Sequence, residues 1–294
     1  MVEPQAGYPL ARLTTVRTGG AAEHFAAAGT EQELLELLRW ARERSLAVHA
    51  VGSGSNLLVA DGGVRGLVVK LAGDLARIEA DAAGGLRCGG GARLPAIAAA
   101  AARLGLGGIE FAVNIPGTVG GAVAMNANAY DGVLAEVLEW VEIATHDGLS
   151  RRVPVELGFA YRSSQIAPGE VVVRALFRLS PARPEDVRAV LAGMRERRHE
   201  AQPKGIRTFG STFKNPQGGE GTAGELLAAA GVAELRFGGA RFSRKHANFV
   251  ENTGGASTAD ILALLAAGRQ RVRERFGIEL EPEVQLLGDA SFPW

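Results

Sequence analysis

Three short segments, far apart in the chain, carry side chains suited to the chemistry of a reactive carboxylate. They are Tyr161-Arg162-Ser163-Ser164, Gly210-Ser211-Thr212-Phe213-Lys214-Asn215-Pro216 and Glu281-Pro282-Glu283-Val284. Arg162 offers a guanidinium, whose fork can bind both oxygens of a carboxylate and which stays charged at any working pH. Ser211 offers a hydroxyl and Glu283 a carboxyl group, and both groups can handle protons.

Each segment also has an ordinary structural interpretation. An arginine after a tyrosine is commonly a surface ion-pair residue, and a Gly-Ser pair is commonly a turn. The alternation in residues 281–286 is typical of a strand whose glutamates face solvent. The functional hypothesis therefore depends on the set of three segments and not on any single member.

A first glycine-rich loop precedes these segments. It reads Gly52-Ser53-Gly54-Ser55-Asn56-Leu57 and directly follows the apolar run 46–51, which predicts a strand. Small residues after a strand let main-chain N–H groups turn toward an anion. The loop is not a Rossmann fingerprint, because Leu57 stands where the third glycine belongs, and no Gly-Lys-Ser/Thr is present to make a P-loop. A plain tight turn is the alternative interpretation.

A second glycine-rich loop covers residues 114–127. Pro116-Gly117 predicts a turn, and Gly120-Gly121 permits positive φ and close approach of the main chain to a flat or charged ligand. A structural turn packed on a strand would explain one glycine pair, but explains poorly why two such loops end strands in one region. A dinucleotide site together with proton-donating groups predicts reduction of an activated double bond.

The elements that must position these loops alternate between helix and strand along the chain. Helices are expected at 31–44, 95–104, 184–199 and 257–276, and strands at 46–51, 67–71, 137–145 and 170–179. Ser257 is expected to cap the last helix and Gly277 to end it. The polar segment 200–208 predicts a linker and a domain boundary.

Composition excludes several classes of protein. Lys+Arg and Asp+Glu both number 32, which argues against a nucleic acid or an anionic membrane surface as the main partner. There is no apolar run of about eighteen residues and no signal peptide, so we expect a cytoplasmic protein without membrane insertion. Cys88 is the single cysteine and cannot form an internal disulfide or a metal cluster alone, so no metal site is expected. No obligate protein partner is evident.

The ordered set of motifs carries a family resemblance. The two glycine loops, Tyr161-Arg162, the segment 210–216 and Glu281-Pro282-Glu283 occur in the order seen in the UDP-N-acetylenolpyruvoylglucosamine reductase family, and the similarity extends from Thr18 to Gly288. The family consists of flavoenzymes that complete UDP-N-acetylmuramate synthesis for bacterial peptidoglycan. The resemblance implies an FAD-binding fold of the vanillyl-alcohol-oxidase type, with subdomains expected at 1–70 and 71–199. A third α+β domain for the nucleotide sugar is expected at 200–277, followed by a segment, 278–294, that carries Glu283.

The resemblance also implies site residues. Ser211 is the expected proton donor, supported by Lys214 or Arg162, and Glu283 is the expected second acid or the group that orients the enol intermediate. FAD contacts are expected at Gly52, Ser53, Gly54, Ser55, Asn56, Leu57, Ile115, Pro116, Gly117, Thr118, Gly120, Gly121, Ala122 and Asn126. Contacts to the nucleotide sugar are expected at Tyr161, Lys214, Asn215 and His246, with hydrogen bonding at strand ends as the alternative for 246–249 and Asn215. NADPH is the implied hydride donor, and FAD is expected to be non-covalent, because His24, His49 and Cys88 lie in no recognised context for a flavin linkage.

The chain departs from the family pattern at a few positions. The family often has glycine where this chain has Asn114, and it reads Asn-Ala-Gly-Ala-Tyr-Gly where this chain has residues 126–131. Asn128 is expected to preserve a left-handed turn there, because asparagine tolerates that geometry. No tyrosine follows Tyr161, and a short segment separates Arg162 from Ser211, so the chain resembles the shorter form that lacks a tyrosine-bearing flap.

Two other classes of function fit the set of motifs less well. A flavin oxidase or dehydrogenase of the same fold, acting on a small alcohol, would leave the Arg162, Ser211 and Glu283 set without a purpose. A catalytically silent UDP-sugar-binding protein predicts loss of at least one of the three residues, and the chain keeps all of them.

Overall fold

The computed structural model describes residues 2–219 and 221–294, which form two compact units. The first unit comprises the chain up to Ala6 together with His24–Gly52 and Gly66–Arg198. The second unit comprises Gly7–Glu23, Ser53–Arg65 and His199–Trp294. The four-part division expected from sequence stays a prediction, because the contacts distinguish these two units only.

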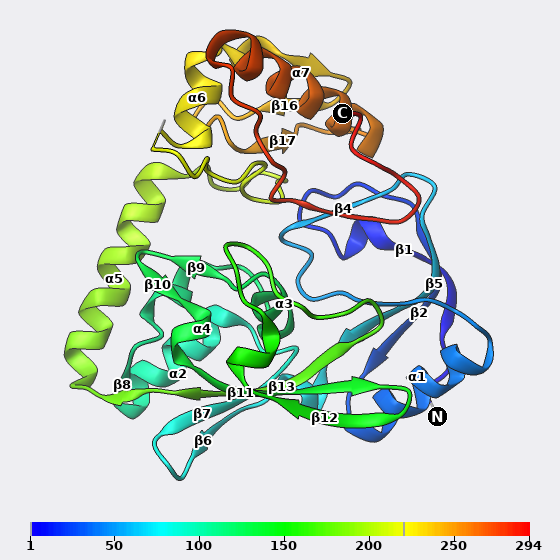
Figure 1. The fold of residues 1–294 in the computed structure, drawn as a ribbon, viewed down its shortest axis with the longest axis vertical. Helices are drawn as coiled ribbons and strands as arrows, with labels where there is room; N and C mark the ends of the chain where they lie inside the picture. Colours follow the sequence, from blue (N-terminus) through cyan, green and yellow to red (C-terminus); the bar gives the residue numbers. More distant parts are fainter. Residues whose placement is uncertain (1, 220) are drawn as a thin grey trace. The chain divides into compact units, whose positions relative to one another are not determined.

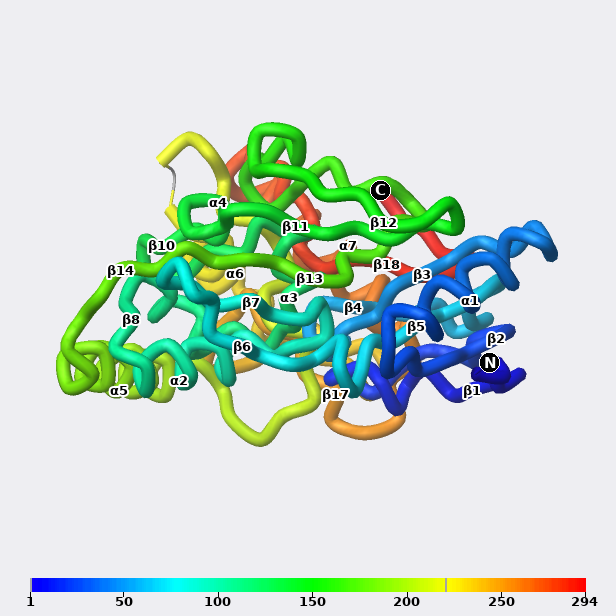
Figure 2. Tube along the Cα trace, turned by 90° about the horizontal axis from the view of Figure 1, so that it is seen from below, coloured from blue at the N-terminus to red at the C-terminus, as the bar shows by residue number. Residues whose placement is uncertain are grey.

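The first unit is built on an antiparallel sheet in the order β12-β11-β13-β7-β6 (Figure 1, Figure 2). Its strands are β6 (Ile78–Asp81), β7 (Gly85–Gly89), β11 (Leu138–Thr145), β12 (Gly148–Arg152) and β13 (Val171–Arg178). One core joins this sheet to α2 (Leu94–Leu104), α3 (Val119–Ala124) and α5 (Pro184–Ala201). A second core joins it to α1 (Glu31–Glu43), β3 (Val48–Ala50) and β5 (Val64–Leu71). The sheet is therefore covered by apolar packing from two sets of elements.

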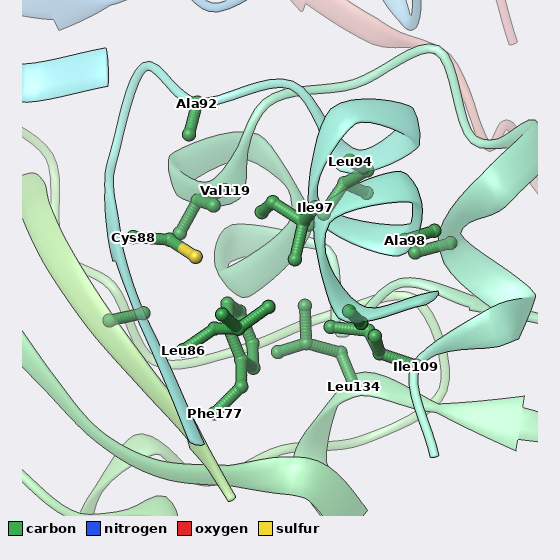
Figure 3. Close-up of a cluster of buried hydrophobic side chains, with 14 of the residues drawn as sticks. Leu86, Cys88, Ala92, Leu94, Ile97, Ala98, Ile109, Val119, Leu134 and Phe177 are labelled. Carbon is green, nitrogen blue, oxygen red and sulfur yellow. The ribbon is translucent and has the colours of Figure 1, made fainter. Parts of the chain in front are cut away.

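Cys88 on β7 is part of the first of these cores. The residue has no exposed surface, and its sulfur lies among Leu86, Ile97 and Val119 (Figure 3). Burial raises the pKa of the Cys88 thiol to about 12, because the thiolate would lose its hydration in this apolar surrounding. Cys88 therefore behaves as a small apolar residue.

The second unit contains an antiparallel sheet of β15 (Arg236–Phe237), β16 (Ala240–Phe242) and β17 (Val250–Asn252), together with α6 (Ala223–Ala229) and α7 (Thr258–Phe276) (Figure 1). Strand β4 (Leu57–Val59) pairs in parallel with β18 (Gln285–Leu287). Gly268 permits the packing of α7 on the sheet, because a Cβ at this position would lie 2.5 Å from Cζ of Phe242. Phe209, Phe213 and Phe242 fill the core of this unit.

Shorter elements connect these parts. They are β1 (Gln5–Pro9), β2 (Ala21–Ala28), β8 (Leu106–Gly107), β9 (Asn128–Ala129), β10 (Gly132–Val133), α4 (Leu134–Val137) and β14 (Ser180–Pro181). β1, β2, β5 and β3 form a sheet in that order, and β2 and β5 each run from one unit into the other. None of the described helices is long and apolar enough to cross a membrane.

The helix ends follow the capping chemistry of the sequence. The hydroxyl of Ser257 accepts a hydrogen bond from the Asp260 amide at 3.0 Å, and Gly277 ends α7 with a φ of 71°. Both expectations are confirmed, as are the helices predicted at 31–44 and 95–104. α5 continues to Ala201, two residues into the predicted linker. The predicted strand at 46–51 is shorter than expected, since β3 covers three residues only.

Candidate functional site

Arg162 lies at the tip of a two-residue turn in the first unit. Ala160 and Ser163 exchange main-chain hydrogen bonds of 3.1 and 3.2 Å, so that Tyr161 and Arg162 close the turn. Arg162 has a φ of 57°, in the left-handed region that glycine or asparagine normally occupies in such a turn. This conformation costs a non-glycine residue roughly 1–2 kcal/mol, and strain of this kind concentrates at functional positions.

The turn is bonded to the segment that follows the second glycine loop. Nδ2 of Asn126 donates to the Ala160 carbonyl at 3.2 Å, and the Ser164 hydroxyl donates to the Ala124 carbonyl at 3.0 Å. Nη1 of Arg162 donates to the Asn128 carbonyl at 3.2 Å. The structure therefore brings Arg162 and residues 124–128 together. The expected role of Asn126 as an FAD contact stays a prediction.

The second glycine loop passes directly into a helix that sequence reasoning missed. Gly120 and Gly121 lie inside α3, and neither uses the positive φ that glycine permits. Tertiary contacts hold this short helix despite its two glycines: the Gly120 amide is bonded to the Gly90 carbonyl at 2.8 Å, and Val119 and Val123 are buried in the core of the first unit. Gly121 is exposed, and a Cβ there would meet nothing nearer than 3.8 Å. The main chain at this point is open to a ligand.

Two glycines of the first loop are required for close packing, Gly52 within the first unit and Gly54 within the second. A Cβ at Gly52 would lie 2.2 Å from Oγ1 of Thr118, which joins the two glycine loops in the first unit. Gly54 has a φ of 62°, and a Cβ there would lie 2.1 Å from the Leu13 carbonyl oxygen. The loops supply main-chain amides and hydroxyl groups and contain no acidic side chain, so their chemistry fits the anionic diphosphate of a dinucleotide.

The departures from the family pattern have structural explanations. Nδ2 of Asn114 donates to the Tyr130 hydroxyl and to the Met194 carbonyl, both at 2.8 Å, and so attaches α5 to the start of the second loop. Asn128 lies in β9, and the positive φ angles of this stretch belong to Asn126 (φ 41°), Tyr130 (φ 49°) and Asp131 (φ 64°), of which the last two join β9 to β10. The expectation that Asn128 itself preserves a left-handed turn is therefore wrong, because the two-residue hairpin needs positive φ at its central residues.

Ser211 and Glu283 come from paired segments of the second unit. Phe213 lies opposite Pro282 in an antiparallel bridge, with hydrogen bonds from the Glu283 amide to the Thr212 carbonyl (2.8 Å) and from the Lys214 amide to the Glu281 carbonyl (2.9 Å). The Ser211 segment also pairs with Phe249. The structure therefore brings together the segments that carry Ser211 and Glu283, whereas Arg162 belongs to the first unit.

Asn56, at the end of the first glycine loop, is bonded to the Glu283 segment. Its Nδ2 donates to the Glu283 carbonyl at 3.0 Å, and the Gln285 amide donates to the Asn56 carbonyl at 3.0 Å. These bonds extend the parallel pairing of β4 with β18. A predicted FAD contact and a predicted catalytic residue are thus held by the same piece of main-chain structure.

The predicted substrate contacts have defined surroundings in the second unit. Nζ of Lys214 lies 3.3 Å from Oε2 of Glu281, and Oδ1 of Asn215 accepts from the Ala223 amide at 3.0 Å. Nδ1 of His246 accepts from the Asn248 amide at 3.3 Å, which leaves Nε2 of the neutral ring as a donor. Burial lowers the pKa of His246 and so favours that neutral form. Their contacts to substrate stay predictions, as does that of the exposed Tyr161.

Two further residues pack around the Ser211 segment: Asn248, which lies in the candidate run 246–249, and Trp294, which sequence reasoning did not single out. Asn248 is buried and hydrogen-bonds the main chain of Phe213, which supports the alternative of strand-end hydrogen bonding at this position. The Trp294 ring lies 6.4 Å from that of Phe213, with the Arg269 guanidinium 5.2 Å from its centroid. Nothing in the spacing of the sequence indicates the contact of Trp294. No group of three or more His, Cys, Asp or Glu within 2–219 and 221–294 could hold a metal ion.

Comparison with known proteins agrees with this geometry. A family model for an FAD binding domain matches residues 22–153, and a model for the C-terminal domain of UDP-N-acetylenolpyruvoylglucosamine reductase matches residues 202–287. UDP-N-acetylenolpyruvoylglucosamine reductase 2 of Symbiobacterium thermophilum is 44% identical over 290 residues, which cover 97% of this chain and 92% of that protein. The chain belongs to the UDP-N-acetylenolpyruvoylglucosamine reductase family.

Other members of the UDP-N-acetylenolpyruvoylglucosamine reductase family match over the same length. The reductase of Myxococcus xanthus is 41% identical, with 98% of this chain and 93% of that protein covered. The crystal structure of the reductase from Thermus caldophilus superposes with a TM-score of 0.83 at 36% identity and covers 98% of this chain and 99% of that one. These matches confirm the predicted FAD-binding fold and make the chain an FAD-dependent oxidoreductase. Between Arg162 and Ser211, a segment described in full, the main elements are β13, β14 and α5, as in a short family member.

Proposed function

We propose that this chain reduces UDP-N-acetylglucosamine enolpyruvate to UDP-N-acetylmuramate, with NADPH as the hydride donor. One observation carries the proposal: the Glu283 amide is bonded to the Thr212 carbonyl at 2.8 Å, so that two proton-handling residues come from paired segments of one unit. Relatives that are more than 40% identical over nearly the whole chain carry the name of this reductase. The chain keeps all three of Arg162, Ser211 and Glu283.

The substrate contains a C=C bond conjugated to a carboxylate, and its reduction places negative charge next to that carboxylate. FAD, which residues of the two glycine loops would hold, would supply the hydride transfer between NADPH and the terminal methylene. Arg162 binds the carboxylate as the charge develops, and such a donor typically stabilises the transition state by about 3 kcal/mol. The left-handed turn that presents Arg162 keeps the guanidinium side chain at the tip of a hairpin.

Ser211 transfers a proton from its hydroxyl to the α-carbon. A free hydroxyl is a weak acid, so the alkoxide left behind needs a cation nearby, and Lys214 is the cation of the same segment. Glu283 acts as the second acid or orients the enol intermediate. His246, neutral and with Nε2 as a donor, contacts the nucleotide sugar together with Tyr161, Lys214 and Asn215.

FAD is held non-covalently by the two glycine loops, at 52–57 and 115–122 with Asn126. Cys88 is unsuited to a flavin linkage, because a fully buried thiol with a raised pKa provides almost no thiolate. The partners are small molecules, without nucleic acid, membrane insertion or an obligate protein partner. The reaction belongs to cytoplasmic peptidoglycan precursor synthesis, and through it to cell shape and division.

One assay tests the proposal. Purified protein should oxidise NADPH rapidly only when UDP-N-acetylglucosamine enolpyruvate is present, and kinetics should be ping-pong because the chain has no separate Rossmann fingerprint for NADPH. Oxygen consumption with small alcohols would indicate an oxidase of the same fold. Tight binding of the UDP-sugar without NADPH turnover would indicate a silent binding protein.

A further inference from the structure

The main chain of Phe213 has an unusual hydrogen-bond partner. The side-chain Oδ1 of Asn248 accepts from the Phe213 amide at 2.9 Å, and Nδ2 of Asn248 donates to the Phe213 carbonyl at 2.8 Å. The Asn248 carbonyl also accepts from the Thr212 amide at 2.8 Å. Asn248 therefore makes three bonds to the two residues that follow Ser211.

The two side-chain bonds take the place of strand pairing at Phe213. On one side of the segment, Thr212 and Lys214 pair with residues 281–283, and Pro282 stands opposite Phe213. In such an antiparallel pair the main-chain groups of Phe213 point away from Pro282. They need other partners, because Phe213 is fully buried and an unpaired buried amide or carbonyl is costly. The Asn248 side chain supplies one acceptor and one donor, as a neighbouring strand would.

We propose that Asn248 is a positioning residue for the proton-transfer step. Its side-chain amide fixes the backbone that follows Ser211 and thereby the register of that backbone with the Glu283 segment. Asparagine suits this role because its side-chain amide carries a hydrogen-bond donor and an acceptor at the same distance from the main chain. An ionised aspartate keeps the acceptor but loses the donor, and leucine has a similar shape with neither group. This inference rests on the proposed role of Ser211.

Asn252 provides a matched control in the same unit. It is buried like Asn248, its Nδ2 donates to the Val16 carbonyl at 2.9 Å, and its Oδ1 accepts from the Gly254 amide at 2.9 Å. It therefore makes a comparable set of bonds to main chain that carries none of the proposed catalytic residues. Asn248→Leu and Asn252→Leu should lower the unfolding temperature to a similar extent.

The experiment measures the two half-reactions separately in the FAD-loaded enzyme. In Asn248→Leu, flavin reduction by NADPH should stay within about threefold of wild type, while reoxidation by the enolpyruvyl sugar should slow by at least about thirtyfold. Asn252→Leu should change neither rate by more than about threefold. Equal losses in both half-reactions, or the same selective loss in Asn252→Leu, would overturn the proposal. A wild-type enzyme that is not reoxidised by the sugar would instead reject the proposed function.

Asn248→Asp adds a test that survives poor folding of the leucine variant. A protonated carboxyl group can both donate and accept, so the variant regains the full bond pattern when its carboxyl group is protonated. Its reoxidation rate, relative to wild type at the same pH, should rise at least about fivefold as pH is lowered across that titration.

Hydrogen exchange at the Phe213 amide should be at least about tenfold faster in Asn248→Leu than in wild type, a readout independent of any substrate. A flat relative pH profile, or unchanged exchange at Phe213, would contradict the positioning role.

Discussion

The Arg162 guanidinium donates to the Asn128 carbonyl at 3.2 Å while the Arg162 backbone is left-handed, with a φ of 57°. The side chain most suited to a carboxylate thus occupies a backbone position suited to glycine. Such a combination predicts that function and stability conflict at this residue.

Arg162→Gly should therefore be more stable than Arg162→Ala, and both variants should be less active than wild type. We expect its free energy of unfolding to exceed that of Arg162→Ala by about 1 kcal/mol, because glycine adopts positive φ without strain. Both variants should be reoxidised by the sugar at least about a hundredfold more slowly than wild type. Denaturant unfolding of the apoprotein measures the first effect and stopped-flow absorbance the second. A glycine variant no more stable than the alanine variant would show that the turn stores no strain.

Ser211→Ala should separate the two half-reactions. Flavin reduction by NADPH should stay within a few-fold of wild type, because no proton from Ser211 is needed until hydride has reached the sugar. Reoxidation should slow by at least about a hundredfold, the lower range for loss of a positioned acid. Ser211→Cys should recover part of the rate. Stopped-flow traces of both steps provide the measurement, and a loss shared equally between them would remove Ser211 from the proton-donor role.

The purified protein should contain about one FAD per chain that acid precipitation releases into the supernatant. The expectation follows from the two glycine loops, whose amides and hydroxyls suit a diphosphate, and from the inert environment of Cys88. Flavin absorbance of the supernatant and the pellet measures the outcome. Colour that stays with the pellet would mean a covalent bond.

His246 should make stability depend on pH below its ordinary titration range. Burial lowers the pKa of His246 in the folded protein, so below the usual value of 6.5 the unfolded chain binds the proton more readily. Stability is therefore full above that value and falls as pH decreases. His246→Asn should lose less unfolding free energy than wild type between about pH 7.5 and about pH 5.5. A variant that loses as much unfolding free energy as wild type between these pH values would show that burial of His246 does not control the effect.

Cys88 should not react with a disulfide reagent until the protein unfolds. With a pKa near 12, its thiolate fraction at about pH 8 is roughly a thousandfold below that of an ordinary cysteine. Absorbance after addition of the reagent should show one thiol per chain in guanidinium and almost none in buffer. Labelling of native protein at the rate of a free thiol would indicate an opening of this core.

The sequence predicted those features that local chemistry determines. The caps at Ser257 and Gly277 and the periodic helices follow from contacts within a few residues, and they are confirmed. The short helix α3 was missed because its two glycines obscure the helical signal of a six-residue segment. The Asn248 bonds to Phe213 join residues far apart in sequence, so no spacing rule could reveal them.

Trp294 has a practical consequence for spectroscopy. Its ring lies 6.4 Å from Phe213, two residues from Ser211, while Trp40 and Trp140 belong to the first unit. Replacing Trp40 and Trp140 with phenylalanine would leave one indole as an intrinsic fluorophore in the unit that holds Ser211. Its emission in the flavin-free protein would then report changes around the Ser211 segment without any attached dye.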